Sequence, residues 1–205
     1  MILCFMENDS LKNLKNKINR YYKIDDYRHA FTILENDFPN EFEDVLNLII
    51  NFRIKKKWII EGGGGKTQIA KNIETHFNKK GWREQKFVVS NKINGKETTS
   101  ETNKIDCFKN KIGLEIQWNN KTEFYDRDLN TFKRLHDLKQ MDVGIMITRD
   151  RDVDRSILKK FDKKISGKYG PSSTIFEKFL NKIKQGSAGS VPILTFAFKG
   201  AIIEQ

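Results

Sequence analysis

The sequence predicts an α/β domain in which helices flank a mixed central β-sheet, with a mainly helical N-terminal third. Apolar residues recur at helical spacing through the first third, whereas shorter apolar segments separated by turn residues follow Trp82. The chain has 205 residues, 38% of them hydrophobic, which suits one domain with a substantial core. We therefore expect a single domain over residues 1–205, mainly helical over residues 1–60 and containing the sheet and its flanking helices over residues 82–198.

Five segments with apolar residues at helical spacing are predicted to be helices. They are residues 8–24, 40–54, 67–80, 127–140 and 172–185. The first begins with an Asn/Asp/Ser cluster and the last with serines, which are residue types that cap helix N-termini. Gly81 follows the third helix, where a glycine commonly ends a helix. The glycines at 62–65 predict a flexible loop between the second and third helices.

Five further segments are predicted to be strands. They are residues 85–90, 104–109, 111–118, 142–148 and 191–198. Residues 142–148 form a nearly continuous apolar run, as expected for a strand buried on both faces. A tight turn around Asn110 joins the second and third strands. Residues 91–103 are predicted to be a polar excursion with an Asn-Gly turn, and residues 149–155 a charged loop.

The composition excludes several classes of protein. The only cysteines are Cys4 and Cys107, so we expect no disulfide framework and a reducing, cytoplasmic setting. The N-terminus lacks the basic and apolar regions of a signal peptide, and no apolar run approaches the roughly 18 residues of a membrane span. Lysine and arginine number 38 against 27 acids, a net charge of +11 that attracts nucleic acid. An AT-rich genome, which enriches lysine and asparagine, is the alternative explanation of that charge.

The segment 105–117 (IDCFKNKIGLEIQ) carries the most informative chemical pattern. Asp106 and Glu115 lie between apolar neighbours in successive predicted strands, and Gln117 shares a strand face with Glu115. Two adjacent carboxylates bind a hard divalent cation, which lowers the pKa of a bound water and offsets charge on a phosphate. The alternative is that both acids are ordinary strand-end residues paired with Lys104 or Lys111.

This pattern resembles that of the PD-(D/E)XK nucleases, in which an acid precedes acid–X–Lys across a β-hairpin. Ile105 stands where that pattern has proline, and Gln117 stands where it has lysine. Residues 115–118 (EIQW) are similar to the end of the motif in the group of type II restriction endonucleases that contains BglII and BstYI. The likeness extends to residues 80–84 (KGWRE), to residues 141–144 (MDVG), and to the Gly-rich loop with the closing Val-Pro strand.

The resemblance, which spans roughly residues 60–198, implies a restriction-endonuclease-like fold and a Mg²⁺ cofactor. It implies that Asp106 and the backbone carbonyl of Ile116 ligate Mg²⁺. Glu115 and Gln117 would complete the metal site by holding waters bound to the ion. A glutamine cannot act as a general base, so the proton of the attacking water would pass to solvent or to a substrate phosphate.

The expected function is that of a Mg²⁺-dependent type II restriction endonuclease that breaks both strands of a short palindromic DNA sequence and leaves 5′-phosphates. In the resembled enzymes, helices in this part of the fold build a two-fold dimer, so helices 127–140 and 172–185 are candidates for a homodimer interface; the alternative is that they only cover the sheet.

A cognate DNA methyltransferase is the expected genetic partner. The alternative functions are a repair or junction-resolving nuclease, a non-catalytic DNA-binding protein on a nuclease-like scaffold, and a nucleotide-binding protein.

The residues expected to contact double-stranded DNA are polar or basic side chains in loops around the metal site. They are Lys66, Asn119, Asn120, Arg149, Arg151, Ser172 and Ser173. Residues 61–67 (EGGGGKT) invite a nucleotide-binding interpretation, with 56–60 (KKWII) as the preceding strand. However, Ile60 occupies the position at which a P-loop requires its first glycine. We favour a flexible loop whose backbone amides and Lys66 meet DNA phosphates, with a plain linker as the alternative.

Overall fold

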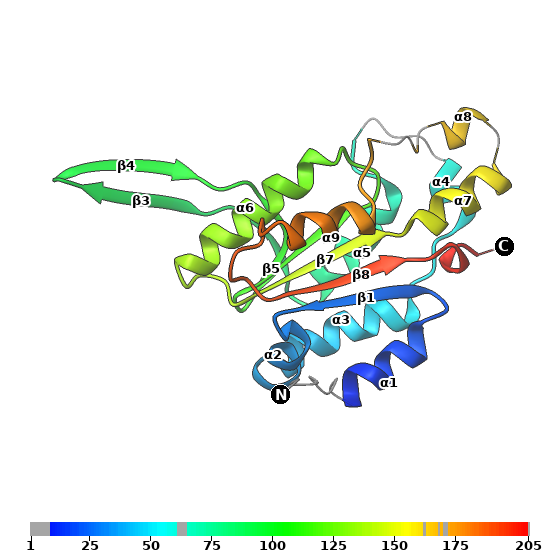
Figure 1. Ribbon diagram of the computed structural model, residues 1–205, viewed down its shortest axis with the longest axis horizontal. Coiled ribbons are helices and arrows are strands. Elements are labelled where there is room, and N and C mark those ends of the chain that lie inside the picture. Colours follow the sequence, from blue (N-terminus) through cyan, green and yellow to red (C-terminus); the bar gives the residue numbers. More distant parts are fainter. Residues whose placement is uncertain (1–8, 61–64, 162, 168, 170–171, 205) are drawn as a thin grey trace.

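A six-stranded mixed β-sheet forms the centre of the computed structural model, which describes residues 9–60, 65–161, 163–167, 169 and 172–204 (Figure 1). Its strands are β1 (Tyr22–Tyr27), β2 (Arg83–Gln85), β5 (Ile105–Lys109), β6 (Ile112–Gln117), β7 (Val143–Arg149) and β8 (Ile193–Phe198). They lie in the order β1-β8-β7-β6-β5-β2. The β6–β7 and β7–β8 pairs are parallel and the other pairs antiparallel, which confirms the predicted mixed sheet.

Helices cover both faces of this sheet. They are α1 (Asp9–Ile18), α2 (Ala30–Asp37), α3 (Pro39–Asn51), α4 (Lys56–Ile60), α5 (Gln68–Lys79), α6 (Glu123–Asp137), α7 (Arg151–Lys160), α8 (Lys163–Ser166), α9 (Phe176–Lys184) and the 3₁₀ turn η1 (Gly200–Ile202). One apolar core joins the N-terminal helices to alternate residues of β6, β7 and β8, and a second joins α6 and α9 to the opposite face. Figure 1 shows α6 and α9 over β5 and β7, with α1, α2 and α3 beside β1. No helix in the described ranges has the length and apolar character needed to cross a membrane.

The β5–β6 hairpin sets the register that the site depends on. Asn110 and Lys111 both have positive φ values, 44° and 64°, as a two-residue hairpin turn requires. This turn places Cys107 opposite Leu114. The alternation of strand side chains then turns Leu114 toward the core of the N-terminal helices and Glu115 toward the face that α6 covers. The predicted strands 104–109 and 111–118 and their turn are confirmed.

The predicted helix 8–24 is wrong in its second half. Helix α1 ends at Ile18, and the chain then forms β1, which pairs with β8 along its whole length. Tyr22 is buried at the start of β1, and its ring centroid lies 5.4 Å from that of Phe198. Tertiary pairing with a strand from the far end of the chain thus overrides the helical spacing of the apolar residues.

The predicted strand 85–90 is divided between two sheets. Strand β2 ends at Gln85, and β3 (Val88–Ile93) pairs instead with β4 (Lys96–Glu101) in a separate two-stranded ribbon. The predicted Asn-Gly turn joins these strands, with φ values of 48° and 82° at Asn94 and Gly95. The ribbon extends away from the rest of the molecule (Figure 1).

The segment 149–155, predicted to be a loop, is ordered secondary structure. Arg149 ends β7, and Asp150 caps α7 by accepting a hydrogen bond from the backbone N–H of Asp152 at 2.9 Å. Helix α9 begins at Phe176 rather than at the serines, because Ser173 is held in an extended bridge to Lys121.

Two further local expectations differ from the structure. Residues 56–60, the strand of the P-loop interpretation, form helix α4, so the strand–loop–helix context of a nucleotide site is missing. Of the glycine loop at 62–65, only Gly65 lies within the described residues. The helix predicted over residues 127–140 ends earlier, because α6 ends at Asp137 and Leu138 is exposed.

Candidate active site

Asp106 lies at the start of β5, in a cleft at the end of the sheet. Its Oδ2 accepts a hydrogen bond from the backbone N–H of Ile116 at 3.0 Å. This bond fixes the carboxylate against β6 and leaves Oδ1 directed at the cleft, where Lys66 Nζ lies 4.0 Å away. The β5–β6 hairpin thus brings Asp106 beside the strand that carries Glu115 and Gln117, as the sequence predicts.

Glu115 is the most unusual group of the site, because its side chain is only 1% exposed. Neither of its carboxylate oxygens has a hydrogen-bond partner among the described residues. Burial raises the pKa of Glu115 well above its ordinary value, and the charges of Asp128 and Asp106 raise it further, as does the hydrogen bond that a protonated Glu115 can make with Asp106. A buried carboxylate without donors is costly unless a cation or a proton compensates it, so this position is suited to a positively charged ligand.

Gln117 is buried and is held by hydrogen bonds at both ends of its carboxamide. Its Nε2 donates to Asp128 Oδ2, and its Oε1 accepts from Asn120 Nδ2. These partners fix which end of the amide faces α6 and which faces the loop after β6. Gln117 therefore has one defined orientation beside the two acids.

Asp128 of α6 is a third acid at the site that the sequence reasoning missed. It is completely buried, and Arg127 donates to its Oδ1 from Nε at 2.9 Å and from Nη2 at 2.8 Å. Burial raises the pKa of Asp128 to about 6, although Arg127 and Gln117 act in the opposite direction. A signal was present, because Asp128 interrupts the apolar stripe of α6 between Tyr125 and Leu129.

The cleft beside these residues has a volume of about 270 Å³. Asp106, Ile116 and Gln117 line it together with three of the predicted DNA contacts, Lys66, Asn119 and Asn120. A second hollow of about 490 Å³ shares Asp106, Lys66 and Glu74 with the first. Asp106 is thus open to a ligand from the surface, whereas Glu115 is buried and lines neither hollow.

The donor set fits a hard divalent cation that keeps several of its own waters. Asp106 and Glu115 offer carboxylate oxygens, and Ile116 at the cleft wall can add its backbone carbonyl. The described residues contain no cluster of three or more acids, histidines or cysteines suited to a metal. A protein site with few ligands is typical of Mg²⁺, which gives up its waters reluctantly.

The alternative pairing of the two acids with neighbouring lysines does not occur. Lys104 Nζ contacts Glu84 Oε1 at 2.6 Å, and Lys111 Nζ lies 3.7 Å from Asp142 Oδ2. Both lysines therefore pair with acids outside the β5–β6 motif.

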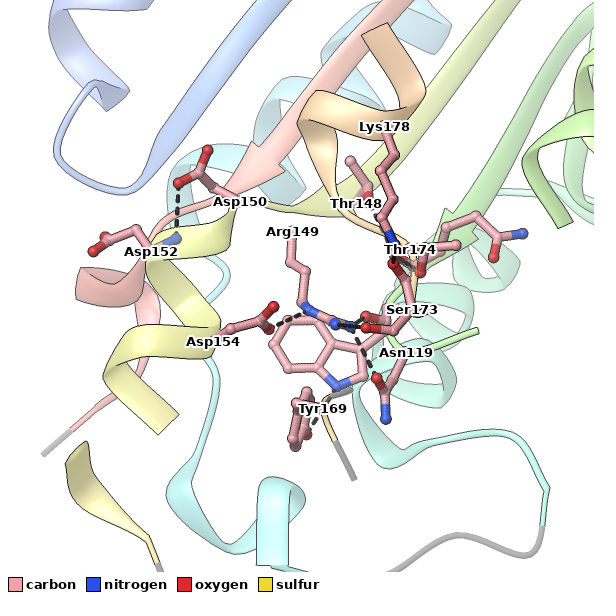
Figure 2. A network of polar contacts seen from close by, with 12 residues as sticks. Asn119, Thr148, Arg149, Asp150, Asp152, Asp154, Tyr169, Ser173, Thr174 and Lys178 are labelled. Atoms are coloured by element: carbon pink, nitrogen blue, oxygen red, sulfur yellow. Dashed lines mark hydrogen bonds and ion pairs between the residues drawn. The ribbon is translucent and has the colours of Figure 1, made fainter. Parts of the chain in front are cut away.

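Arg149, a predicted DNA contact, lies in a second polar cluster next to the site (Figure 2). Its side chain is completely buried, and Nε donates to Asp154 Oδ1 at 2.7 Å. Nη1 donates to the carbonyl of Trp118 and to Asn119 Oδ1, and Nη2 donates to Ser173 Oγ at 2.6 Å. In this arrangement Arg149 ties loops together and presents no surface to a DNA base.

The remaining predicted DNA contacts differ in accessibility. Ser173 is buried in the Arg149 cluster, whereas Arg151 and Ser172 are exposed. Asn120 is half-buried because its amide binds Gln117. Contact with DNA stays a prediction for all of these residues.

The sequence family of the chain is consistent with this geometry. The family model for restriction endonuclease BglII/BglIII matches residues 22–198, which begin at the first residue of β1 and end at the last residue of β8. No curated protein matches the chain. The match covers every strand of the central sheet and the whole acidic site, and it confirms the resemblance drawn from the motif. The chain therefore belongs to the BglII/BglIII family of restriction endonucleases, which are DNA-cleaving hydrolases generally dependent on a divalent metal.

Proposed function

We propose that this restriction endonuclease is a Mg²⁺-dependent type II enzyme that cleaves both strands of a short palindromic DNA sequence and leaves 5′-phosphates. The observation that carries the proposal is Glu115, a buried carboxylate that receives no hydrogen bond from the described residues, next to Asp106, which lines an open cleft. A buried carboxylate in that state beside an accessible one suits a cation brought to a phosphate.

Asp106, Glu115 and the carbonyl of Ile116 are the residues that would hold Mg²⁺. When bound, the ion would lower the pKa of a water and offset negative charge on the phosphate. In the hydrolysis, a bond forms between the water oxygen and phosphorus, the bond from phosphorus to the 3′ oxygen breaks, and the leaving 3′ oxygen takes up a proton from solvent. Gln117, fixed by Asp128 and Asn120, orients the water with a defined amide end. The proton of that water passes to solvent or to a phosphate oxygen, since an amide is not a base at neutral pH.

Symmetric cleavage of a palindrome requires two active sites related by a two-fold axis, so we propose a homodimer. The apolar residues of α6 and α9, such as Phe132 and Phe179, are buried against the sheet. These two helices would therefore contribute their outer polar sides to a dimer. A cognate DNA methyltransferase would protect the host sequence.

Digestion of phage DNA by the purified chain with Mg²⁺ tests this function. We expect a reproducible set of discrete fragments whose ends carry 5′-phosphates, and no cleavage when EDTA replaces Mg²⁺. Asp106→Ala should abolish cleavage while largely sparing DNA binding in a gel-shift assay. A smear would contradict sequence specificity, cleavage confined to branched DNA would indicate a junction nuclease, and binding without cleavage would indicate a non-catalytic protein.

A further inference from the structure

The active site has no cation at the position where the acid–X–Lys pattern has its lysine. Gln117 occupies that position, and its amide is held by Asp128 and Asn120. The guanidinium of Arg127 reaches the cleft, but two of its nitrogens bind Asp128. Among the described residues of this cleft, Lys66 is the other side chain that carries a positive charge.

Lys66 reaches the site from a different part of the chain, the segment just before α5. Thr67 caps this helix by accepting a hydrogen bond from the backbone N–H of Ala70 at 3.2 Å, which fixes the chain next to Lys66. The ammonium lies 4.0 Å from Asp106 Oδ1 and forms an ion pair with Glu74, two helical turns further along α5. Lys66 lines both hollows that Asp106 lines and is 38% exposed, so a ligand in the cleft can reach it.

The contacts of Lys66 are those of a cation. Its ammonium pairs with Glu74 and lies near Asp106, and the ordinary pKa of lysine leaves the side chain positively charged at neutral pH. A cation held beside the carboxylate that faces the substrate is suited to binding a phosphate oxygen.

We propose that Lys66 is a catalytic residue that supplies, from the segment just before α5, the positive charge that the acid–X–Lys pattern supplies from β6. Its ammonium contacts a non-bridging oxygen of the scissile phosphate and stabilises the charge that develops there during cleavage. Glu74 is its positioning residue, because it holds the ammonium at the cleft when the metal takes the place of the ammonium at Asp106. This inference rests on the proposed nuclease function and adds a residue to its site.

The test compares Lys66→Met and Lys66→Arg with Lys71→Met, a matched change at an exposed lysine in the first turn of α5. Single-turnover cleavage is measured with saturating enzyme and Mg²⁺, DNA affinity is measured with Ca²⁺ in place of Mg²⁺, and Mg²⁺ affinity is measured by calorimetry without DNA. We expect Lys66→Met to slow cleavage by about a hundredfold, the usual loss of one group that stabilises developing charge. DNA affinity should fall by less than about tenfold, as for one lost phosphate contact. Removal of the competing ammonium should leave Mg²⁺ affinity equal or higher.

The Lys66→Arg variant shows whether cleavage needs the positive charge of Lys66 or the shape of its side chain. Lys66→Arg should retain at least about a tenth of the wild-type rate, because the positive charge remains, and Lys71→Met should cleave like the wild type. Thermal unfolding of each variant identifies any loss that comes from misfolding, in which case Lys66→Gln replaces Lys66→Met in the comparison.

Three results would overturn the inference. The first is a cleavage rate for Lys66→Met within about threefold of wild type. The second is a fall in DNA affinity that accounts for the whole loss, which would make Lys66 an ordinary DNA contact. The third is a loss for Lys66→Arg as large as for Lys66→Met. A wild-type protein that cuts no DNA at all would overturn the proposed function itself, whereas these three results would leave that function standing.

The role of Glu74 is tested by combining substitutions. Glu74→Gln should slow single-turnover cleavage by about tenfold in the wild type and by little in the Lys66→Met background, because a positioning residue acts through its partner. An equal loss in both backgrounds would show that Glu74 acts independently of Lys66 and would overturn this part of the inference.

Discussion

Two buried polar clusters lie side by side at the ends of β6 and β7, and they differ in whether their charge is satisfied. In the first, Glu115 is almost completely buried and neither oxygen receives a hydrogen bond from the described residues. In the second, Arg149 is also completely buried, but each of its three side-chain nitrogens has an acceptor (Figure 2). The two clusters share the same strands and similar burial, yet they have opposite energetic consequences.

A buried charge whose partners are complete contributes to a unique structure, whereas one without partners costs stability until a ligand arrives. Arg149 connects the loop after β6, the loop before α9 and helix α7 through Asn119, Ser173 and Asp154. Glu115 receives no hydrogen bond from the described residues and links no loops. We infer that the Arg149 cluster has a structural role, which is to hold the walls of the cleft in place. The Glu115 cluster, in contrast, has a catalytic role.

Glu115→Gln is the substitution expected to have the largest effect on the first cluster. Cleavage should fall by at least about a thousandfold, because the proposed metal site would lose a carboxylate ligand and with it several kcal/mol of transition-state stabilisation. The unfolding temperature should not fall, since the change removes an uncompensated buried charge. Single-turnover cleavage and thermal unfolding measure the two effects on one preparation. Near-normal cleavage would contradict the catalytic role of Glu115, and the two clusters would then not differ in function.

Arg149→Met is the matching change in the second cluster, and its effect should fall on stability. Loss of the guanidinium leaves Asp154 and the Trp118 carbonyl without their partner, at a cost of about 3 kcal/mol. Chemical denaturation measures this cost. Arg151→Met at the exposed start of α7 is the control and should change stability by no more than about 0.5 kcal/mol. Equal stability of the two variants would remove the structural role assigned to Arg149.

These two clusters also show what could be predicted from the sequence. Asp106 and Glu115 could be paired because the hairpin between them is local, and its turn residues and alternating pattern fix the register. Arg149 could not be placed, because three of its four hydrogen-bond partners, Trp118, Asn119 and Ser173, lie 24 to 31 positions away in the chain. Charged residues are usually exposed, so a charged run after a strand indicates a loop unless those distant partners are known.

The same reasoning explains the errors in the rest of the fold. Strand β1 was hidden because its pairing with β8 depends on the opposite end of the chain, while its apolar spacing continued that of α1. Asp128 was missed because only the packing of α6 over β6 brings its side chain to the site. An acid within the apolar stripe of a helix was nevertheless a signal in the sequence. The central strands were predictable because their continuous apolar character does not depend on the partner.

The acids of the first cluster should make the stability of the protein depend on pH in the absence of metal. Burial raises the pKa of Glu115, and it raises that of Asp128 from 3.8 to about 6, so folding favours the protonated form of both groups. The stability they contribute is complete below about pH 4 and is lost as the pH rises through 6 and beyond. We expect Glu115→Gln to be more stable than wild type by about 1–3 kcal/mol at pH 8 and by much less at pH 4. Denaturation curves at both pH values measure the difference.

Addition of Mg²⁺ at pH 8 provides the control for that measurement. The ion should stabilise the wild type and leave Glu115→Gln nearly unchanged, because binding to the folded state raises stability by mass action. A stability difference that is the same at both pH values would assign the effect of the substitution to packing instead of charge.

Asp128→Asn is expected to have the smallest effect, and it tests whether the two clusters are as separate as their hydrogen bonds indicate. Asparagine keeps the shape of the side chain but weakens the bonds to Arg127 and Gln117, so Gln117 loses its fixed orientation. Cleavage should slow by about tenfold, and the loss should nearly vanish when Gln117 is already alanine, since Asp128 acts through it. Combination with Arg149→Met should give additive effects, because no hydrogen bond joins Asp128 to the Arg149 cluster among the interactions of the described residues. Additivity with Gln117→Ala together with strong coupling to Arg149→Met would reverse the assignment and place Asp128 in the structural cluster.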